Sequence, residues 1–269
     1  LTIDVPIGMI NNAWGGSACE AWVNRDVLKA NEKFAPMMAR WEAQEKQFAE
    51  LSGNNSLNDD QKKALEGLKR QMTGNSRPAN IYNGVLKSHL GYTIRGAIWY
   101  QGESNHTEGM LYLEKMKALV GGWRALWGRE FPFYYVQIAP FNYGSQDPTV
   151  LAQFWEAQAA AQQAIPHSGM VVINDIATLN DIHPPNKQDV GQRLALWALK
   201  HDYGREELVA AGPEAERLES ADGVLKVHFR NAAGGLKSRD GKPLSHFEII
   251  GPGSGGFHPA EAVIEGPST

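Results

Sequence analysis

Several common functional signatures are absent from this chain of 269 residues. Its single cysteine, Cys19, excludes an internal disulfide framework and a zinc site built from cysteines. No apolar run approaches the roughly 20 residues that a membrane-spanning helix needs, which argues against a membrane anchor within these residues. The net charge of -4, with acidic and basic residues interleaved, leaves no basic stripe for nucleic acid.

Signature motifs for phosphate and serine chemistry are also missing. The paired glycines of Trp14-Gly15-Gly16-Ser17 match neither the dinucleotide-binding fingerprint nor a P-loop. No Gly-x-Ser-x-Gly elbow occurs, so the familiar strand-to-helix position of a nucleophilic serine is absent. The histidines and acidic residues show no recognised metal-ligand spacing. We therefore expect no metal and no cofactor.

Short apolar runs alternate with helical patterns along the first two hundred residues. The runs are rich in β-branched or aromatic residues, which is typical of strands buried on both faces of a parallel sheet. Because helix-like segments separate them, the order predicts βαβ units in a layered α/β fold. The predicted strands are 5–10, 96–100, 133–138 and 170–173, and the predicted helices are 21–30, 34–51, 59–72, 111–127, 150–165 and 187–200.

Changes in composition predict how the chain is divided. Residues 32–78 form a charged helical insertion between loop-rich stretches, with Asp59 as the expected cap of its second helix. From about residue 208, Gly-rich turns separate the strand-like segments 224–230 and 246–250. We expect a main domain over residues 1–207 and the start of a small β-rich region over 208–269.

Two polar clusters follow predicted strands. Gln101, Glu103 and Asn105 come directly after the strand at 96–100, and Asp181 and His183 follow the strand at 170–173. Ligand sites of open parallel sheets lie beyond the carboxyl ends of the strands, so both clusters are expected at one site.

The residue types in these clusters suit proton transfer and charge stabilisation. The imidazole of His183 can take and return a proton, and Asp181 can fix its tautomer. Gln101 can donate amide hydrogens to an oxyanion, while Glu103 can support the imidazole. Each also has an ordinary interpretation, as a surface histidine or as a loop cap. The two strand exits favour the catalytic interpretation for His183.

The glycine pair offers a further candidate. An exposed amide at Gly16 can bind an anion or an oxyanion, because glycine lets the backbone approach a ligand closely. Its neighbours have structural interpretations: Ser17 is expected to cap a helix, Ser104 to be a structural hydroxyl, and Cys19 to be a buried space filler.

In order and spacing, several motifs together resemble the sialate O-acetylesterase family of SGNH hydrolases. The resemblance covers residues 5–200, and its motifs are specific. They are Pro6-Ile7-Gly8-Met9-Ile10, Trp14-Gly15-Gly16-Ser17, Glu20-Ala21-Trp22, Ile81-Tyr82-Asn83-Gly84, Gly96-Ala97-Ile98-Trp99-Tyr100-Gln101-Gly102-Glu103-Ser104-Asn105, Phe131-Pro132-Phe133 with Val136-Gln137, Trp155-Glu156-Ala157-Gln158, and Asp181-Ile182-His183-Pro184 through Lys187-Gln188-Asp189-Val190-Gly191-Gln192-Arg193-Leu194-Ala195.

The resemblance implies a three-layer α/β/α, flavodoxin-like fold and a serine esterase that removes O-acetyl groups from sugars. His183 would act as general base and then general acid, and Gly16, Gln101 and Asn105 would form the oxyanion and substrate-binding side. Related esterases carry a carboxylate three residues before the histidine, where this chain has Asn180. Asp181, Glu103 or both therefore remain candidates for the acid partner.

The chain departs from the family at the nucleophile. The family's serine lies in a Gly-Gln-Ser-Asn-Met block upstream of the segment resembling 5–10, and this sequence has no such block. The resemblance places the missing strand between 5–10 and 96–100. We expect the missing strand and the nucleophilic serine to come from an upstream segment, a separate cleaved chain or another molecule. Leu1, which is not a methionine, is not expected to be the natural start.

The expected partner is an acetylated carbohydrate. The resemblance leaves the sugar open, so an acetylxylan esterase is an alternative to a sialate O-acetylesterase, and a secreted or periplasmic location is suggested by the family alone. The missing serine leaves a second alternative, a catalytically silent carbohydrate-binding protein.

Overall fold

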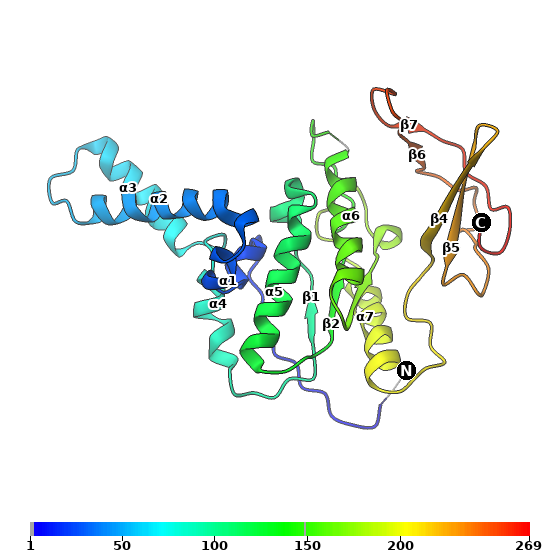
Figure 1. Ribbon diagram of the computed structural model, residues 1–269, viewed down its shortest axis with the longest axis horizontal. Helices are drawn as coiled ribbons and strands as arrows, with labels where there is room; N and C mark the ends of the chain where they lie inside the picture. The colour runs from blue at the N-terminus through cyan, green and yellow to red at the C-terminus, as the bar shows by residue number, and fades with distance from the viewer. Residues whose placement is uncertain (1–2, 148) are drawn as a thin grey trace. The chain divides into compact units, whose positions relative to one another are not determined.

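A computed structural model describes residues 3–147 and 149–269, and Leu1 lies outside them. The chain divides into two compact units that are interleaved along the sequence (Figure 1). Unit 1 comprises Leu1–Ile138 and Gln153–Gly169, and unit 2 comprises Ala139–Ala152 and Met170–Thr269. The domain boundary near residue 208 stays a prediction.

A three-stranded sheet confirms the predicted α/β class and three of the four predicted strands. Its order is β1 (Ala97–Trp99), β2 (Phe133–Val136) and β3 (Ser168–Val171). β1 and β2 pair in parallel, with Ala97 opposite Phe133 and Trp99 opposite Tyr135. All four residues of β2 are buried, as expected for a central strand.

The predicted strand at 5–10 is wrong for this structure. These residues lie in coil, and Met9 is 72% exposed. A strand requires a neighbour that completes its backbone hydrogen bonds. In the described sheet β1 is an edge strand, and Ile98 on it is 54% exposed. The expected burial of β1 on both faces is therefore also wrong.

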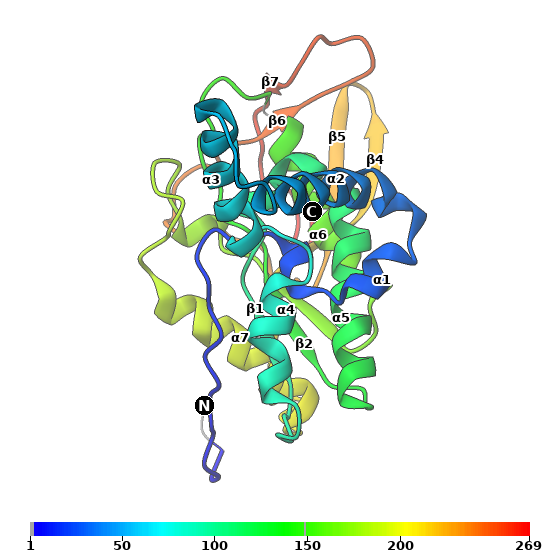
Figure 2. The same cartoon turned by 90° about the vertical axis from the view of Figure 1, so that its left-hand side faces the viewer.

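The core of unit 1 forms where α5 (Leu111–Trp127) lies along β1 and β2, as both ribbon views show (Figures 1 and 2). Trp99 on β1 meets Trp22 and Trp123 edge-on, with ring centroids 5.6 and 5.7 Å apart. The bounds of α5 match the prediction, and the helix ends at Gly128, whose φ of +63° is the left-handed conformation that glycine favours at helix ends.

The predicted insertion forms a helical hairpin, α2 (Ala35–Ser52) and α3 (Asp59–Thr73), which Figure 2 shows folded back on itself. The expected cap at Asp59 is wrong, because Asn58 occupies the cap. Its side chain accepts from the Gln61 amide, and the Gln61 side chain accepts from the Asn58 amide in return. Asp59 is already inside the first turn.

Shorter elements complete unit 1. The single helix expected at 21–30 is broken into η1 (Cys19–Trp22) and α1 (Arg25–Lys29), because Val23 is extended and the Asn24 side chain starts a new helix by accepting from the Asp26 amide. The others are η2 (Glu32–Phe34), α4 (Asn80–Gly84), η3 (Leu86–His89), η4 (Glu103–Glu108) and most of α6 (Thr149–Ala164).

Unit 2 contains η5 (Asn174–Ile176), the predicted helix α7 (Lys187–Asp202) and the C-terminal strands. β4 (Glu214–Ala221) and β5 (Val224–Arg230) form an antiparallel hairpin. Its turn, Asp222-Gly223, has φ values of +52° and +75°, the two-residue geometry that Asp-Gly favours. β6 (Glu248–Ile249) and β7 (His258–Pro259) make a second, shorter pair.

Candidate functional site

The chain turns sharply at the end of β1, and Gly102 makes this turn possible. Its φ is +155°, and a β-carbon added there would lie 2.7 Å from Ile138 Cγ2 and 2.8 Å from Phe154 Cε1. Only glycine satisfies both the backbone conformation and the space. Gln101 therefore leaves the strand in a fixed direction, and η4 begins immediately with Glu103.

Gly102→Ala is expected to lower the free energy of unfolding by about 3 kcal/mol, because the new methyl overpacks the core and the φ is strained. Urea denaturation followed by circular dichroism measures the loss. Gly121→Ala is the matched control: it lies within α5, and its β-carbon would have no heavy atom within 4 Å. Equal stability of the Gly102 variant and the parent would contradict this account of the turn.

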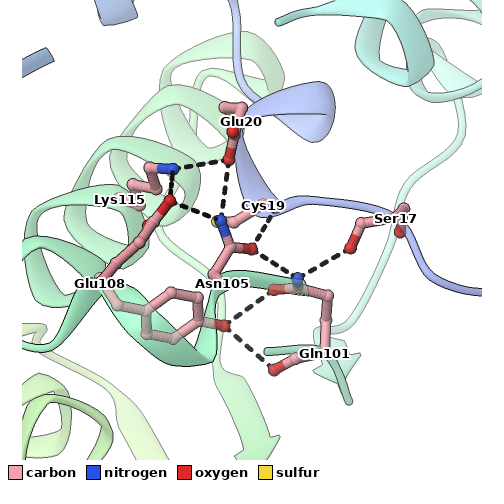
Figure 3. Close-up of polar contacts among 8 residues, drawn as sticks. Ser17, Cys19, Glu20, Gln101, Asn105, Glu108 and Lys115 are labelled. Atoms are coloured by element: carbon pink, nitrogen blue, oxygen red, sulfur yellow. Dashed lines mark hydrogen bonds and ion pairs between the residues drawn. The ribbon is translucent and has the colours of Figure 1, made fainter. Parts of the chain in front are cut away.

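Gln101 is buried and its amide is fully hydrogen-bonded (Figure 3). Nε2 donates to the Ser17 carbonyl and to Asn105 Oδ1, both at 2.8 Å. Oε1 accepts from the Tyr112 hydroxyl at 2.9 Å. These partners fix which end of the amide is nitrogen. They also occupy both amide hydrogens, so Gln101 has none to spare for a ligand in this conformation.

Asn105 connects Gln101 to a set of buried charges. It is 1% exposed, and its Oδ1 also accepts from the Cys19 amide at 2.9 Å. Its Nδ2 donates to Glu20 Oε2 at 3.0 Å and to Glu108 Oε1 at 3.1 Å. All four hydrogen-bonding positions of the Asn105 amide are thus used, which suits an orienting residue better than a ligand-binding one.

The charges behind Asn105 come from one lysine between two glutamates. Lys115 Nζ lies 2.7 Å from both Glu20 Oε2 and Glu108 Oε1, and its side chain is 1% exposed. Burial disfavours the ammonium ion, but the two carboxylates outweigh it and raise the pKa of Lys115 above its ordinary value. The lysine therefore stays charged and keeps both carboxylates facing Asn105.

The Gly15-Gly16 turn is held to η4 and to the insertion. Ser104 Oγ donates to the Gly16 carbonyl at 2.8 Å, and Asn75 Nδ2 donates to the Gly15 carbonyl at 2.7 Å. Gly16 is exposed with a φ of +66°, and its amide has no acceptor among the residues that the structure describes. The structural interpretation of Ser104 is confirmed.

Two other expectations at this turn have different outcomes. Ser17 does not cap a helix: Ala18 holds the cap position of η1, and Ser17 Oγ instead accepts from Trp22 Nε1 at 2.9 Å. The indole N–H of the buried Trp22 needs an acceptor, which explains why the Ser17 hydroxyl contacts Trp22 instead of the helix start. Cys19 is fully buried, as expected, and burial raises the pKa of its thiol well above the usual range.

Unit 2 carries the other predicted pair. His183 and Asp181 are both exposed, and Asp181 Oδ1 accepts from the His183 backbone amide at 2.8 Å. The carboxylate thus shapes the loop, and no bond from it to an imidazole nitrogen is found in the described structure. The chain then enters α7, where Asn186 Oδ1 accepts from the Asp189 amide at 3.2 Å.

The structure brings together Gly16, Gln101 and Asn105 of the predicted site residues, and Glu103 begins η4 beside them. Sequence reasoning missed the supporting charges of Glu20, Glu108 and Lys115. Lys115 carried a usable signal, because it falls on the apolar face of α5 with Tyr112, Met116, Leu119 and Trp123.

The described residues, 3–147 and 149–269, include no group of three histidine, cysteine or acidic side chains able to hold a metal ion. Among the helices of that same part, none has the length and hydropathy of a membrane span.

Comparison with known proteins gives matches along most of the chain. A family model described as a carbohydrate esterase, sialic acid-specific acetylesterase, matches residues 72–200. The sialate O-acetylesterase of Mus musculus is 26% identical over 248 residues, covering 85% of this chain and 46% of that protein. The Homo sapiens enzyme of the same name is 28% identical, covering 85% and 42%.

A solved structure, a carbohydrate acetylesterase from Xanthomonas citri, superposes with a TM-score of 0.71 and 33% identity, covering 94% of this chain and 50% of that one. The fold is thus that of an SGNH-like carbohydrate esterase. The chain is thus similar to sialate O-acetylesterases over most of its length, and the family model itself matches residues 72–200. It spans less than half the length of the mouse and human proteins that it matches.

Proposed function

We propose that this chain forms part of a carbohydrate O-acetylesterase that hydrolyses acetyl esters of sugars through a serine acyl-enzyme. The observation that carries the proposal is the pair of hydrogen bonds that join the loop after β1 to the Gly16–Ser17 turn: Gln101 donates to the Ser17 carbonyl and Ser104 donates to the Gly16 carbonyl. Such a rigid, backbone-rich rim is what stabilisation of a tetrahedral intermediate requires. The family match over residues 72–200 supports the same chemistry.

In this mechanism His183 removes the proton of the serine as its oxygen attacks the acetyl carbonyl. The tetrahedral intermediate then collapses, and the same imidazole returns the proton to the departing sugar oxygen. Water repeats the sequence on the acetyl-enzyme, with His183 again as base, and releases acetate. His183 is exposed in the structure, which is compatible with a group that meets substrate and solvent in turn.

The oxyanion would receive hydrogen bonds from the exposed Gly16 amide and the amide of the serine. Both hydrogens of Gln101 Nε2 are engaged with the Ser17 carbonyl and Asn105 Oδ1, so Gln101 would act by holding the turn that carries the Gly16 amide, rather than as the oxyanion donor expected from the sequence. Asn105 would retain its bonds and hold Gln101 in position.

The acid partner of His183 is Asp181, Glu103 or both. Asp181 lies two residues before the histidine, but its Oδ1 accepts from the His183 backbone amide. Asp181→Asn and Glu103→Gln keep the size of each side chain while removing the charge. The partner is the residue whose replacement lowers kcat by at least tenfold and flattens the rise of kcat with pH.

We further propose that the nucleophilic serine is supplied from outside these 269 residues, together with a strand that pairs with the open edge of β1. Two observations support this: Ile98 on that edge is exposed, and the largely apolar residues 5–10 lie in coil and pair with no strand of the described structure. A strand inserted there would supply backbone hydrogen bonds to the open edge of β1 and to residues 5–10.

Acetate release tests the function and the source of the serine together. The chain alone, and the chain with the segment that precedes it in its natural protein, are assayed on 4-nitrophenyl acetate, O-acetylated sialic acid and acetylated xylan fragments. We expect turnover only with the preceding segment. Turnover by the homogeneous chain alone would overturn the external serine. Sugar binding without acetate release in either form would select the catalytically silent alternative.

A further inference from the structure

Three side chains hold the successive carbonyl oxygens of Gly15, Gly16 and Ser17. In that order, the donors are Asn75 Nδ2 at 2.7 Å, Ser104 Oγ at 2.8 Å and Gln101 Nε2 at 2.8 Å. The last two come from the loop after β1, whereas Asn75 follows α3 of the insertion. Because a peptide unit is planar and rigid, each of these bonds fixes the orientation of one peptide. Asn75 fixes the peptide between Gly15 and Gly16.

This peptide carries the amide that the proposed mechanism directs at the oxyanion. In a trans peptide the C=O and N–H lie in one plane and point in opposite directions, so an anchor on the Gly15 oxygen sets the direction of the Gly16 hydrogen. Asn75 binds on the carbonyl side and leaves the opposite side of the peptide open. The Gly16 amide has no acceptor among the described residues, so its hydrogen is available to a ligand.

Without an anchor, the peptide between Gly15 and Gly16 would turn over easily. A flip of one peptide changes ψ of the residue before it and φ of the residue after it, and glycine adopts φ of either sign at little cost. Gly16 already has a φ of +66°. A β-carbon at Gly15 would meet no heavy atom within 4 Å, so close packing does not hold this residue either. The direction of the Gly16 amide therefore depends on the hydrogen bond at the Gly15 oxygen.

Asn75 is itself held in place on both sides. Its backbone carbonyl accepts from the Ala18 amide at 3.1 Å, so Asn75 binds both ends of the turn. Asn80 Nδ2 donates at 2.8 Å to the carbonyl of Gly74, the residue before Asn75. A supporting side chain fixes a site only when its own position is fixed, and Asn75 meets this condition.

We propose that Asn75 is a positioning residue that aims the Gly16 amide by preventing a flip of the Gly15–Gly16 peptide. The inference rests on the proposed esterase function, since the amide serves catalysis only where an oxyanion forms. The bond also makes the Gly16 N–H a stronger donor, because a hydrogen bond at the carbonyl oxygen polarises the peptide. The insertion at 32–78 thereby acquires a role in the site, as the source of this anchor.

NMR of the chain tests the anchor without the serine. Glycine labelled with carbon-13 at the carbonyl and nitrogen-15 at the amide makes only Gly-Gly peptides visible in a carbonyl–nitrogen correlation spectrum. These peptides are 15–16, 121–122, 234–235 and 255–256. The 15–16 signal is identified as the one that Gly15→Ala removes, a change for which the structure has space.

Asn75→Asp keeps the size of the side chain, but its ionised carboxylate has no hydrogen to donate at neutral pH. We expect the Gly15 carbonyl carbon to shift upfield, because its oxygen loses a hydrogen bond, and the other Gly-Gly signals to stay in place. Asn55→Asp is the matched control. It makes the same charge change at an exposed asparagine between α2 and α3, and should leave every Gly-Gly signal unmoved.

Acetate release by the chain with its preceding segment tests whether the anchor serves catalysis. Asn75→Asp should lower kcat at least tenfold per folded molecule, because a misdirected amide no longer stabilises the tetrahedral intermediate. KM should change by less than threefold, since the amide acts on the intermediate rather than on the bound ester. Asn55→Asp should retain both constants.

Any of three results would overturn the proposal: a 15–16 signal that does not move in Asn75→Asp, a moved signal with unchanged kcat, or a loss of activity that lies in KM alone. Failure of the esterase function is a separate result, because the parent chain with its preceding segment then releases no acetate. A moved 15–16 signal in such a protein would support the anchor and reject the hydrolytic role.

Discussion

His183→Ala is expected to lower kcat for acetate release by about 10³-fold, because the serine then loses both its general base and the acid that protonates the leaving sugar. KM should change by less than threefold, since the imidazole acts on the proton rather than on the sugar. The measurement uses whichever species shows turnover, with 4-nitrophenyl acetate and O-acetylated sialic acid as substrates.

Stability distinguishes catalysis from structure in this variant. His183 is exposed, so its truncation should move Tm by no more than about 1 °C. His201→Ala is the matched control, because His201 is also an exposed histidine of unit 2, on α7, where it stacks on Trp197. The control should keep kcat. Parallel loss of fold and activity in the His183 variant would favour the structural interpretation of this histidine.

Lys115→Met is expected to lower the free energy of unfolding by about 3–5 kcal/mol. Methionine fills similar space, but it leaves the buried Glu20 carboxylate and the partly buried Glu108 carboxylate without their counter-ion, a situation that costs this much in other proteins. Urea denaturation at neutral pH measures the change. Lys117→Met is the control, because Lys117 lies on the same helix with its side chain 45% exposed.

A double variant shows whether the loss comes from the uncompensated charge. Glu108→Gln removes one of the two carboxylates, so Lys115→Met with Glu108→Gln should recover part of the stability that Lys115→Met alone loses. Additive losses would contradict the ion-pair account. The pH dependence of the stability follows from the raised pKa of Lys115. The charged lysine stabilises the fold at pH values below the ordinary lysine pKa, and this stabilisation disappears as the pH rises through the pKa of Lys115 in the folded protein.

The Lys115 variants also test whether the ion pair affects the candidate site as well as the stability of the fold. Without Lys115 the carboxylates lose the charge that holds them toward Asn105 Nδ2, and Asn105 in turn orients Gln101. A fall in kcat that exceeds the fraction of unfolded protein would identify Lys115 as a positioning residue.

Local sequence determined those elements whose signals lie within a few residues of one another. The apolar face of α5 with glycine after its last turn, the capping pair of Asn58 and Gln61, and the Asp222-Gly223 turn each depend on short-range contacts. β4 went unrecognised because Glu214–Ala221 has the composition of a helix, and only pairing with β5 makes it a strand.

The motifs also indicated the resemblance to sialate O-acetylesterases and the candidate residues Gly16, Gln101 and Asn105. Only the tertiary structure decided what their side chains do. Segments more than 80 residues apart meet at Gln101 and Asn105, and the hydrogen-bond count of each amide depends on those distant partners. Whether a segment becomes an edge strand, a central strand or coil likewise depends on the strands available to pair with it. Residues 5–10 have the sequence pattern of a strand but lie in coil, because no described strand completes their backbone hydrogen bonds.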